Sequence, residues 1–255
     1  MVSVPAPSYP CDCQGRHIDL EEARTRLEPL GAQERLVWAQ ATFGDGFALT
    51  TSFGIQAAVL LHMVSGLAQT SGKQVQVIWV DTGYLPPETY QYAEQLCQQL
   101  ELKLYVAQAV MSPARMEALH GRLWETAAVE DLNLYHRIRK VDPLDQALDA
   151  LAVTCWASGV RGRQTDHRNA MQVLDPVRER WSLRPLLSWS KRDVFYYMQE
   201  NGLPQHPLFE QGYSTLGDWH SSAPDGEGLS GRATRFGGLK QECGIHLPGV
   251  MGEGI

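Results

Sequence analysis

The order of hydrophobic and polar residues along the chain predicts strands and helices in alternation. Residues 47–54, "FALTTSFG", are mostly apolar and follow the turn dipeptide Asp45-Gly46, which predicts a short buried strand ending in a glycine turn. In residues 55–68, apolar side chains recur every four positions, which predicts a helix. Similar patterns predict strands over 75–80, 102–108 and 153–160, and helices from the Pro86-Pro87 turn to residue 100 and over 112–125, 143–151 and 190–201.

Strands that alternate with helices indicate a mostly parallel sheet covered on both faces, so we expect a doubly wound α/β fold. Beyond about residue 212 the periodicity stops and Gly, Ser, Asp and Pro dominate, which predicts a loop or mobile tail. We therefore expect an N-terminal segment over 1–24, a large α/β domain over 25–216 and a C-terminal tail over 217–255. The stretch 217–239 is poor in apolar residues, so few buried contacts are expected there.

Composition and charge narrow the classes of function. The chain has 255 residues, 44% of them hydrophobic, and a formal net charge of −7. This balance is not typical of proteins that bind nucleic acid or membrane surfaces, so an anionic ligand needs a local group of cationic side chains. No apolar run reaches the roughly 18 residues of a membrane span, and residues 1–13 lack a signal-peptide pattern. The five dispersed cysteines indicate free thiols in a reducing cytosol.

Polar groups suited to an anionic ligand lie at the ends of two predicted strands, where ligands of such sheets bind. In residues 50–54, "TTSFG", hydroxyls and a glycine N–H group lead into the start of a helix, an arrangement that favours anions. Alternatively, Ser52 only caps that helix. Asp81 follows the next strand, at a place where an acid often binds ribose. Alternatively, it caps the turn at Gly83.

A third segment is strongly basic. The stretch "SGVRGRQTDHR" places Arg161, Arg163 and Arg168 directly after an apolar strand. Upstream, "YHRIRKVDPL" adds further cationic side chains, including Lys140. Arginine suits bidentate contacts with phosphate or sulfate, whereas the plainer alternative is a solvated charged surface.

The cysteines differ in their settings. Cys97 shares a helical face with apolar residues and Cys155 lies in an apolar strand, so both are predicted to be core residues. A single C-x-C at Cys11 and Cys13 is weak support for a metal site, and none is predicted. Cys243 is unusual, because free cysteines are mostly buried whereas this one lies in the predicted tail.

Six segments of the chain together resemble the assimilatory phosphoadenylyl-sulfate (PAPS) reductases, which belong to the adenine nucleotide α-hydrolase-like group. The segments keep the family order and span roughly residues 40–247. The resemblance implies a cytoplasmic enzyme of sulfate assimilation and cysteine biosynthesis that reduces PAPS to sulfite and adenosine 3′,5′-bisphosphate. The six segments are "TTSFGIQAAVLLHMV", "VDTGYLPPETY", "YHRIRKVDPLDQAL", "TCWASGVRGRQTDHR", "HPLFEQGYSTLGDWH" and "TRFGGLKQECGIHL".

The resemblance also implies a mechanism and a set of site residues. Cys243 would be the nucleophile, and its thiolate would attack the sulfur of PAPS to give a Cys S-sulfonate. Reduced thioredoxin, or glutaredoxin, would discharge that adduct by thiol exchange, with no bound cofactor. Nearby Arg232 would favour the thiolate. The sequence does not decide between a monomer and a homodimer. The substrate-binding residues expected on this basis are Ser52, Phe53, Gly54, Asp81, Lys140, Gly159, Arg161, Arg163, Arg168, Arg235, Lys240 and His246.

The related iron–sulfur adenylyl-sulfate (APS) reductases share this architecture and bind a cluster through four cysteines. Their adjacent cysteine pair precedes the "IRKV" segment, and their C-x-x-C follows "GYSTLG". Here those positions hold Tyr135-His136 and residues 218–221, "DWHS", so the sequence predicts no cluster and a preference for PAPS. One departure concerns Arg161, which Gly162 follows where many members of both groups have a second basic residue. Which side chain holds which phosphate therefore stays open.

Three alternative functions fit parts of the sequence. An APS reductase is the nearest of them. An ATP pyrophosphatase of the same superfold would carry a Ser-Gly-Gly-x-Asp-Ser loop, and "TTSFGIQ" lacks its Asp and final Ser. A non-catalytic adenine-nucleotide sensor is the third, since fold does not fix function, but a sensor has no need of a cysteine in the tail.

Overall fold

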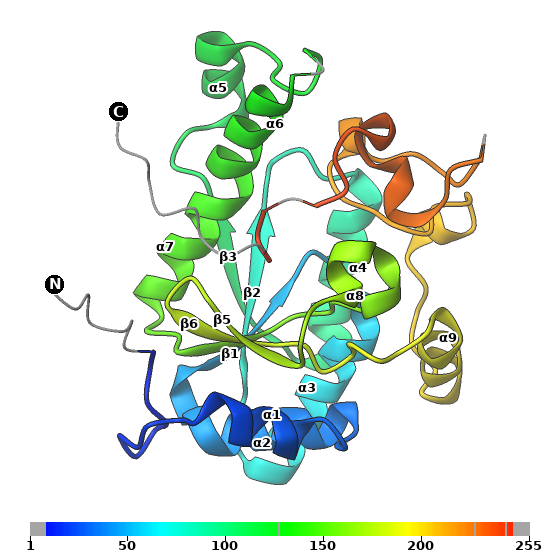
Figure 1. Cartoon of the computed structure of the whole chain (residues 1–255). Helices are drawn as coiled ribbons and strands as arrows, with labels where there is room; N and C mark the ends of the chain where they lie inside the picture. Colours follow the sequence, from blue (N-terminus) through cyan, green and yellow to red (C-terminus); the bar gives the residue numbers. More distant parts are fainter. Residues whose placement is uncertain (1–8, 127, 227, 243, 247–255) are drawn as a thin grey trace, which may run out of the picture.

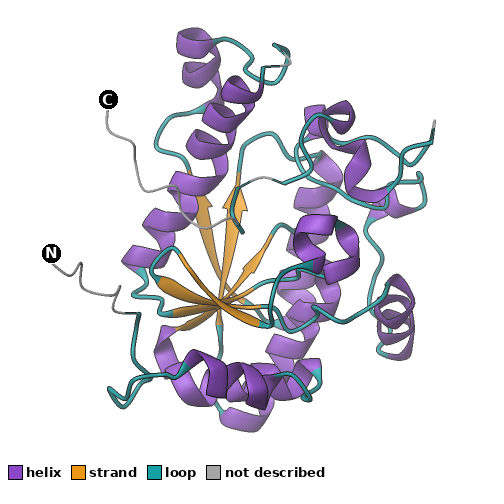
Figure 2. Ribbon diagram, in the orientation of Figure 1, coloured by secondary structure: helices purple, strands orange, loops and turns teal. Residues whose placement is uncertain are grey.

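Within the residues that the structure describes, the centre of the molecule is a six-stranded sheet with the order β3-β2-β1-β4-β6-β5 (Figures 1 and 2). This computed structural model describes residues 9–126, 128–226, 228–242 and 244–246. Neighbouring strands from β3 to β6 are parallel, and β5 pairs antiparallel with β6. The strands are β1 (Phe47–Thr51), β2 (Gln76–Asp81), β3 (Lys103–Gln108), β4 (Cys155–Ala157), β5 (Leu174–Val177) and β6 (Arg180–Leu183).

Helices cover both faces of this sheet, which confirms the doubly wound α/β prediction (Figure 1). On one face the larger core joins the strands to α2, α3 and α4 through Leu36, Leu61 and Leu96. On the other face α7 packs on Ile78 and Trp156. The α-helices are α1 (Leu20–Leu27), α2 (Ala32–Phe43), α3 (Ala57–Ser71), α4 (Pro87–Leu100), α5 (Pro113–His120), α6 (Val129–His136), α7 (Asp142–Ala150), α8 (Asp166–Asn169) and α9 (Lys191–Glu200); the π-helical turn η2 (Arg137–Val141) links α6 to α7.

Local sequence explains where the predicted helices begin. In α4, Pro87 stands in the first turn, where a missing N–H group costs nothing. In α9, the Ser190 hydroxyl accepts a hydrogen bond from Asp193 N at 3.2 Å and the Asp193 carboxylate accepts one from Ser190 N at 2.7 Å, a complete capping box. The predicted N-cap of α9 is therefore confirmed.

The strand order reverses beside β1, and this reversal creates the site of the molecule. From β1 the chain crosses through α3 to β2 and on to β3, whereas β4 lies on the other side of β1. The loops that leave β1 and β4 therefore part in opposite directions at the carboxyl edge of the sheet. Such a switch point is where open α/β sheets bind ligands.

Several elements were not predicted from the sequence. They include α1, α2, α6, α8 and the β5–β6 hairpin. Leu27 and Phe43 of the first two helices belong to the larger core, so the expected boundary at residue 24 falls inside α1. Across the described ranges, no helix is both long enough and apolar enough to cross a membrane.

The expectation of few buried contacts over 217–239 is wrong. Asp218, Ser221, Thr234 and Arg235 are buried, and Trp219 N donates to the carbonyl oxygen of Tyr84 at 2.8 Å. Polar groups make these contacts, so an apolar pattern could not reveal them. Mobility of the tail stays a prediction.

Candidate active site

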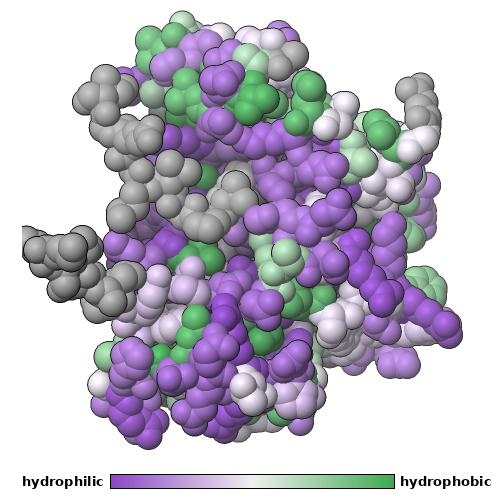
Figure 3. All heavy atoms as spheres, viewed as in Figure 1, coloured by the Kyte–Doolittle hydropathy of each residue, from purple (hydrophilic) through white to green (hydrophobic). Residues whose placement is uncertain are grey.

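A cavity of about 230 Å³ lies at the carboxyl edge of the sheet, at the switch point beside β1. Its walls include the β1–α3 turn, the end of β2 with the loop that follows it, the segment after β4, the start of α7 with η2, and the tail. Figure 3 shows this face of the molecule, which is mainly hydrophilic, with hydrophobic residues gathered at the top over α5 and α6. Of the residues predicted to bind substrate, the cavity is lined by Ser52, Gly54, Lys140, Gly159, Arg161, Arg168, Arg235 and His246.

The β1–α3 turn places Ser52 and Gly54 at the cavity. The Thr51 hydroxyl accepts a hydrogen bond from Phe53 N at 3.1 Å, and Phe53 adopts a φ of 45°. This turn buries the Phe53 side chain against Trp79, with ring centroids 4.9 Å apart. Helix α3 has Gln56 as its N-cap residue, so the alternative that Ser52 only caps the helix is wrong.

Two buried arginines form one wall of the cavity. Arg161 donates to the Gln56 side chain, and burial together with the nearby Arg168 charge lowers its pKa. Arg168 donates to Glu242 from two nitrogens, at 2.8 and 2.9 Å, and to Gln164 at 2.5 Å. Arg161 and Arg168 of the basic segment therefore belong to the cavity wall and not to a solvated surface.

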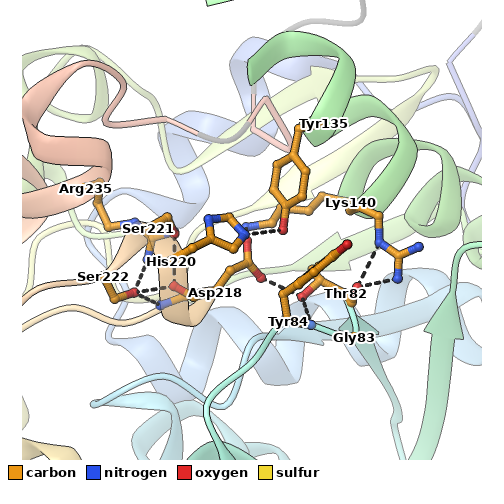
Figure 4. Close-up of polar contacts among 12 residues, drawn as sticks. Thr82, Gly83, Tyr84, Tyr135, Lys140, Asp218, His220, Ser221, Ser222 and Arg235 are labelled. Carbon is orange, nitrogen blue, oxygen red and sulfur yellow. Dashed lines mark hydrogen bonds and ion pairs between the residues drawn. The ribbon is translucent and has the colours of Figure 1, made fainter. Parts of the chain in front are cut away.

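A second cationic group, Lys140 with Arg235, faces the cavity from η2 and the tail. Between Lys140 and Thr82 lies the Asp218 carboxylate (Figure 4), whose Oδ2 is 2.6 Å from Lys140 Nζ. Burial opposes ionisation of this carboxyl, but Lys140, Thr82 and Arg235 outweigh that effect and lower its pKa. Asp218 is therefore a carboxylate at neutral pH.

The tail segment around Cys243 is anchored on both sides in the described residues. Glu242 is held by Arg168, and Arg178 donates to the carbonyl oxygens of Gly244 at 2.9 Å and Ile245 at 3.3 Å. The next residue, His246, stacks on Trp156 at a centroid distance of 5.4 Å. Burial and the surrounding arginines lower the pKa of His246, so its imidazole is neutral at pH 7. Cys243 itself lies outside the described residues.

Four residues expected in the site are placed elsewhere. Phe53 is a core residue, and Arg163 is exposed outside the cavity lining. Lys240 donates to the side chain of Asn133 and is not part of the lining. Asp81 accepts from Gly83 N at 2.8 Å, as in the turn-capping alternative, and from Tyr90 and Gln108.

Sequence reasoning missed the acidic partners of the cations. The sequence presents Asp218 only as one of the positions without a cluster cysteine, and Glu242 only as a letter of the segment that contains Cys243. A glycine-rich, polar context gave no sign that either would be buried beside a basic side chain. One feature of the sequence does point to such partners. The basic segment lies in a chain of net negative charge, and a buried basic side chain needs a carboxylate beside it.

Three of the four positions at which the resemblance places cluster cysteines in APS reductases, Tyr135, Asp218 and Ser221, lie near one another in this structure (Figure 4). Tyr135 Oη and His220 Nε2 lie 3.0 Å apart, and Figure 4 shows both beside Asp218 and Ser221. In the described part of the chain, no group of three His, Cys, Asp or Glu side chains is arranged to hold a metal ion.

The other described cysteines lack the setting of a nucleophile. Burial raises the pKa of the Cys155 thiol far above its usual value, as expected for a core residue. Burial and the Glu94 carboxylate also raise the pKa of Cys97. Cys11 and Cys13 are exposed near the N-terminus, and neither lines the cavity.

Comparison with known proteins identifies the family of the chain. Residues 46–224 match the family model "Phosphoadenosine phosphosulfate reductase domain". The chain is 51% identical over 229 residues to the phosphoadenosine 5′-phosphosulfate reductase of Synechococcus sp., covering 89% of this chain and 97% of that protein. The corresponding protein of Synechocystis sp. is 48% identical over 232 residues, covering 91% and 92%.

Solved structures show the same fold. The PAPS reductase of Candida auris, a phosphate complex, superimposes with a TM-score of 0.67 and 29% identity, covering 81% of this chain and 98% of that one. An FMN adenylyltransferase of Candida glabrata, 13% identical with a TM-score of 0.57, covers 82% of this chain and 68% of its own and shares the fold alone. The chain therefore belongs to the phosphoadenosine phosphosulfate reductase family and is an oxidoreductase.

Proposed function

We propose that the protein reduces PAPS to sulfite and adenosine 3′,5′-bisphosphate, with thioredoxin or glutaredoxin as the electron donor, in the cytoplasm and in the service of sulfate assimilation. The observation that carries this proposal is the concentration of positive charge around the cavity. Among the described residues, its lining includes Lys140, Arg161, Arg168, Arg232 and Arg235, in a chain whose net charge is −7. A PAPS molecule carries anionic groups at the 3′ and 5′ positions of one ribose, and these cations suit them.

The reaction needs a nucleophile for sulfur, and we propose Cys243. Its thiolate attacks the sulfonate sulfur, so that an S–S bond forms while the S–O bond to the phosphate breaks and adenosine 3′,5′-bisphosphate leaves. Fixed cations stabilise the charge that develops on the leaving group. The raised pKa values of Cys97 and Cys155 support this choice of thiol.

The second step regenerates the enzyme. A thioredoxin thiolate attacks the Cys243 sulfur and expels sulfite, and the second thioredoxin thiol then resolves the mixed disulfide. The two electrons come from the thioredoxin dithiol, which becomes a disulfide. The reaction therefore needs no iron–sulfur cluster, consistent with Tyr135, His136, Asp218 and Ser221 at the cluster positions.

A sulfite-release assay tests the proposal. Protein with reduced thioredoxin should turn over PAPS at least about tenfold faster than APS, because APS lacks the 3′-phosphate that the cavity arginines bind. Omitting thioredoxin should stop turnover after one equivalent of adenosine bisphosphate. Equal rates with both nucleotides, or sulfite release that requires added iron, would contradict the proposal.

A further inference from the structure

Asp218 is an unexpected group for a cavity that binds an anion. Its side chain is fully buried, and it lines the same cavity as Lys140 and Arg235. A carboxylate at this place repels an anionic ligand, and burying it costs free energy unless it is paired. Its presence therefore calls for a role that outweighs both costs.

We propose that Asp218 is a positioning residue that fixes the Lys140 ammonium toward the anion bound in the cavity. The inference rests on the proposed function, since that anion is the phosphosulfate nucleotide. A lysine side chain is flexible and its ammonium carries three donors. Asp218 Oδ2 takes one of them at 2.6 Å, which leaves the other two for the ligand.

The Asp218 carboxylate is itself held from several sides. Its Oδ1 accepts a hydrogen bond from the Thr82 hydroxyl at 2.5 Å. The Thr82 carbonyl oxygen in turn accepts from Arg139 Nε at 2.8 Å. The hydroxyls of Ser221 and Ser222 donate to the Asp218 carbonyl oxygen at 3.1 and 3.0 Å. Residues from the loop after β2, from η2 and from the tail thus share one network (Figure 4).

The setting of Lys140 fits this role. It stands in the π-helical turn η2, a kind of turn that is frequent at functional sites. Its Nζ lies 6.0 Å from the centre of the Tyr135 ring. Charge stabilisation in catalysis requires groups that are fixed before the reaction begins, and the Asp218 network supplies that fixation.

The alternative is that the ion pair only stabilises the fold. In that case, neutralising either Asp218 or Lys140 lowers the free energy of unfolding but leaves kcat/KM of the folded molecules unchanged. The two roles are therefore separated by kinetics measured on folded protein, together with the coupling between the two side chains.

The experiment compares Asp218→Asn, Lys140→Met and the double variant in the full chain. The asparagine side chain retains an acceptor for the Thr82 hydroxyl but carries no charge, and the folded state of each variant is checked by circular dichroism. We expect each single variant to lower kcat/KM for PAPS by about tenfold or more, and the double variant to be no worse than Lys140→Met. Asp149→Asn is the matched control, because Asp149 pairs with Arg180 outside the cavity, and it should stay within about twofold of wild type.

Wild-type kcat/KM in Asp218→Asn or in Lys140→Met would overturn the proposal, and so would losses that multiply in the double variant. If Asp218→Asn does not fold, the double variant replaces it in the test, because it removes both buried charges together. Its kcat/KM is then compared with that of Lys140→Met, and a further loss in the double variant would overturn the proposal. If the wild-type protein releases no sulfite from PAPS, the proposed function fails. Calorimetric affinity for adenosine 3′,5′-bisphosphate then decides the positioning role, with non-additive weakening supporting it and unchanged affinity overturning it.

Discussion

Arg168, which the family resemblance predicts to bind substrate, lies in a buried ion pair. Its guanidinium side chain is 6% exposed and the Glu242 side chain 15%. Glu242 therefore competes with any phosphate for the same guanidinium, or shares it. Arg168 therefore holds the tail through Glu242, in addition to any contact that it makes with the ligand.

Arg168→Ala should consequently lower stability as well as weaken substrate binding. Removing Arg168 takes away the two hydrogen bonds that it donates to Glu242 and leaves this carboxylate with its contacts to Arg232 and Thr165. Breaking a pair of this kind costs about 3 kcal/mol. Urea unfolding measures the free energy, and KM for PAPS should rise in parallel. Arg163→Ala is the control at an exposed position, and its unfolding free energy should change by less than about 0.5 kcal/mol. An unchanged stability in Arg168→Ala would show that the pair with Glu242 contributes nothing.

The buried histidines predict how stability depends on pH. Burial lowers the pKa of His206 from 6.5 to about 4, and that of His220 likewise to about 4. Below pH 6.5 the unfolded chain binds protons that the folded chain does not, so stability falls as pH falls from 6.5 toward 4. At pH 5.5 each such histidine should cost about 1 kcal/mol.

Unfolding free energies at pH 7.5 and pH 5.5 test this. His206→Asn is the informative variant, because an asparagine oxygen can replace His206 Nδ1 as the acceptor for Leu208 N. The loss of stability between the two pH values should be smaller in this variant. An identical loss would exclude His206 as a source of the pH dependence.

At the scale of elements, the sequence predicted those strands and helices in which apolar residues recur at regular spacing. The strands β1, β2, β3 and β4 and the helices α3, α4 and α9 were found because buried positions recur at strand or helix spacing. The β5–β6 hairpin was missed for a physical reason. Its turn residues Arg178 and Glu179 have φ values of 55° and 59°, a conformation normally marked by Asn or Gly, and neither is present.

This hairpin turn offers a test at the same scale. Glu179→Gly should raise the unfolding free energy by up to about 1 kcal/mol, because glycine adopts positive φ without strain. Glu179→Ala is the control, since it removes the same charge and keeps the strained Cβ, and it should bring no such gain. Equal effects of the two substitutions would show that charge and not backbone strain decides. Arg178 must stay, because it donates to Asp145 and to the tail.

The candidate site could be predicted in part, because glycine turns and cations at strand ends are visible in sequence. The cavity does bring together Ser52, Gly54 and Arg161. It does not include Asp81, since a turn-capping aspartate and a ribose-binding aspartate look alike without coordinates. The buried partner of Lys140 was also invisible, because Asp218 lies 78 positions away in a segment without periodicity.

At the scale of the whole molecule, the tail belongs to the site and does not merely cover it. Asp218 and Arg235 supply part of the cavity wall, and Glu242 pairs with Arg168, which also lines the cavity. A truncation after residue 216 removes these groups and leaves the Lys140 charge without Asp218. Lys140 and Arg168 therefore depend on the tail for their acidic partners. The proposed chemistry depends on the tail for its thiol.

The most direct measurement is mass spectrometry of the full chain after incubation with PAPS in the absence of thioredoxin. The account predicts a sulfonate adduct on Cys243, its discharge as sulfite when reduced thioredoxin is added, and no adduct in Cys243→Ser, while Cys97→Ser behaves as wild type. An adduct on Cys97 or Cys155, or sulfite release by Cys243→Ser, would contradict it.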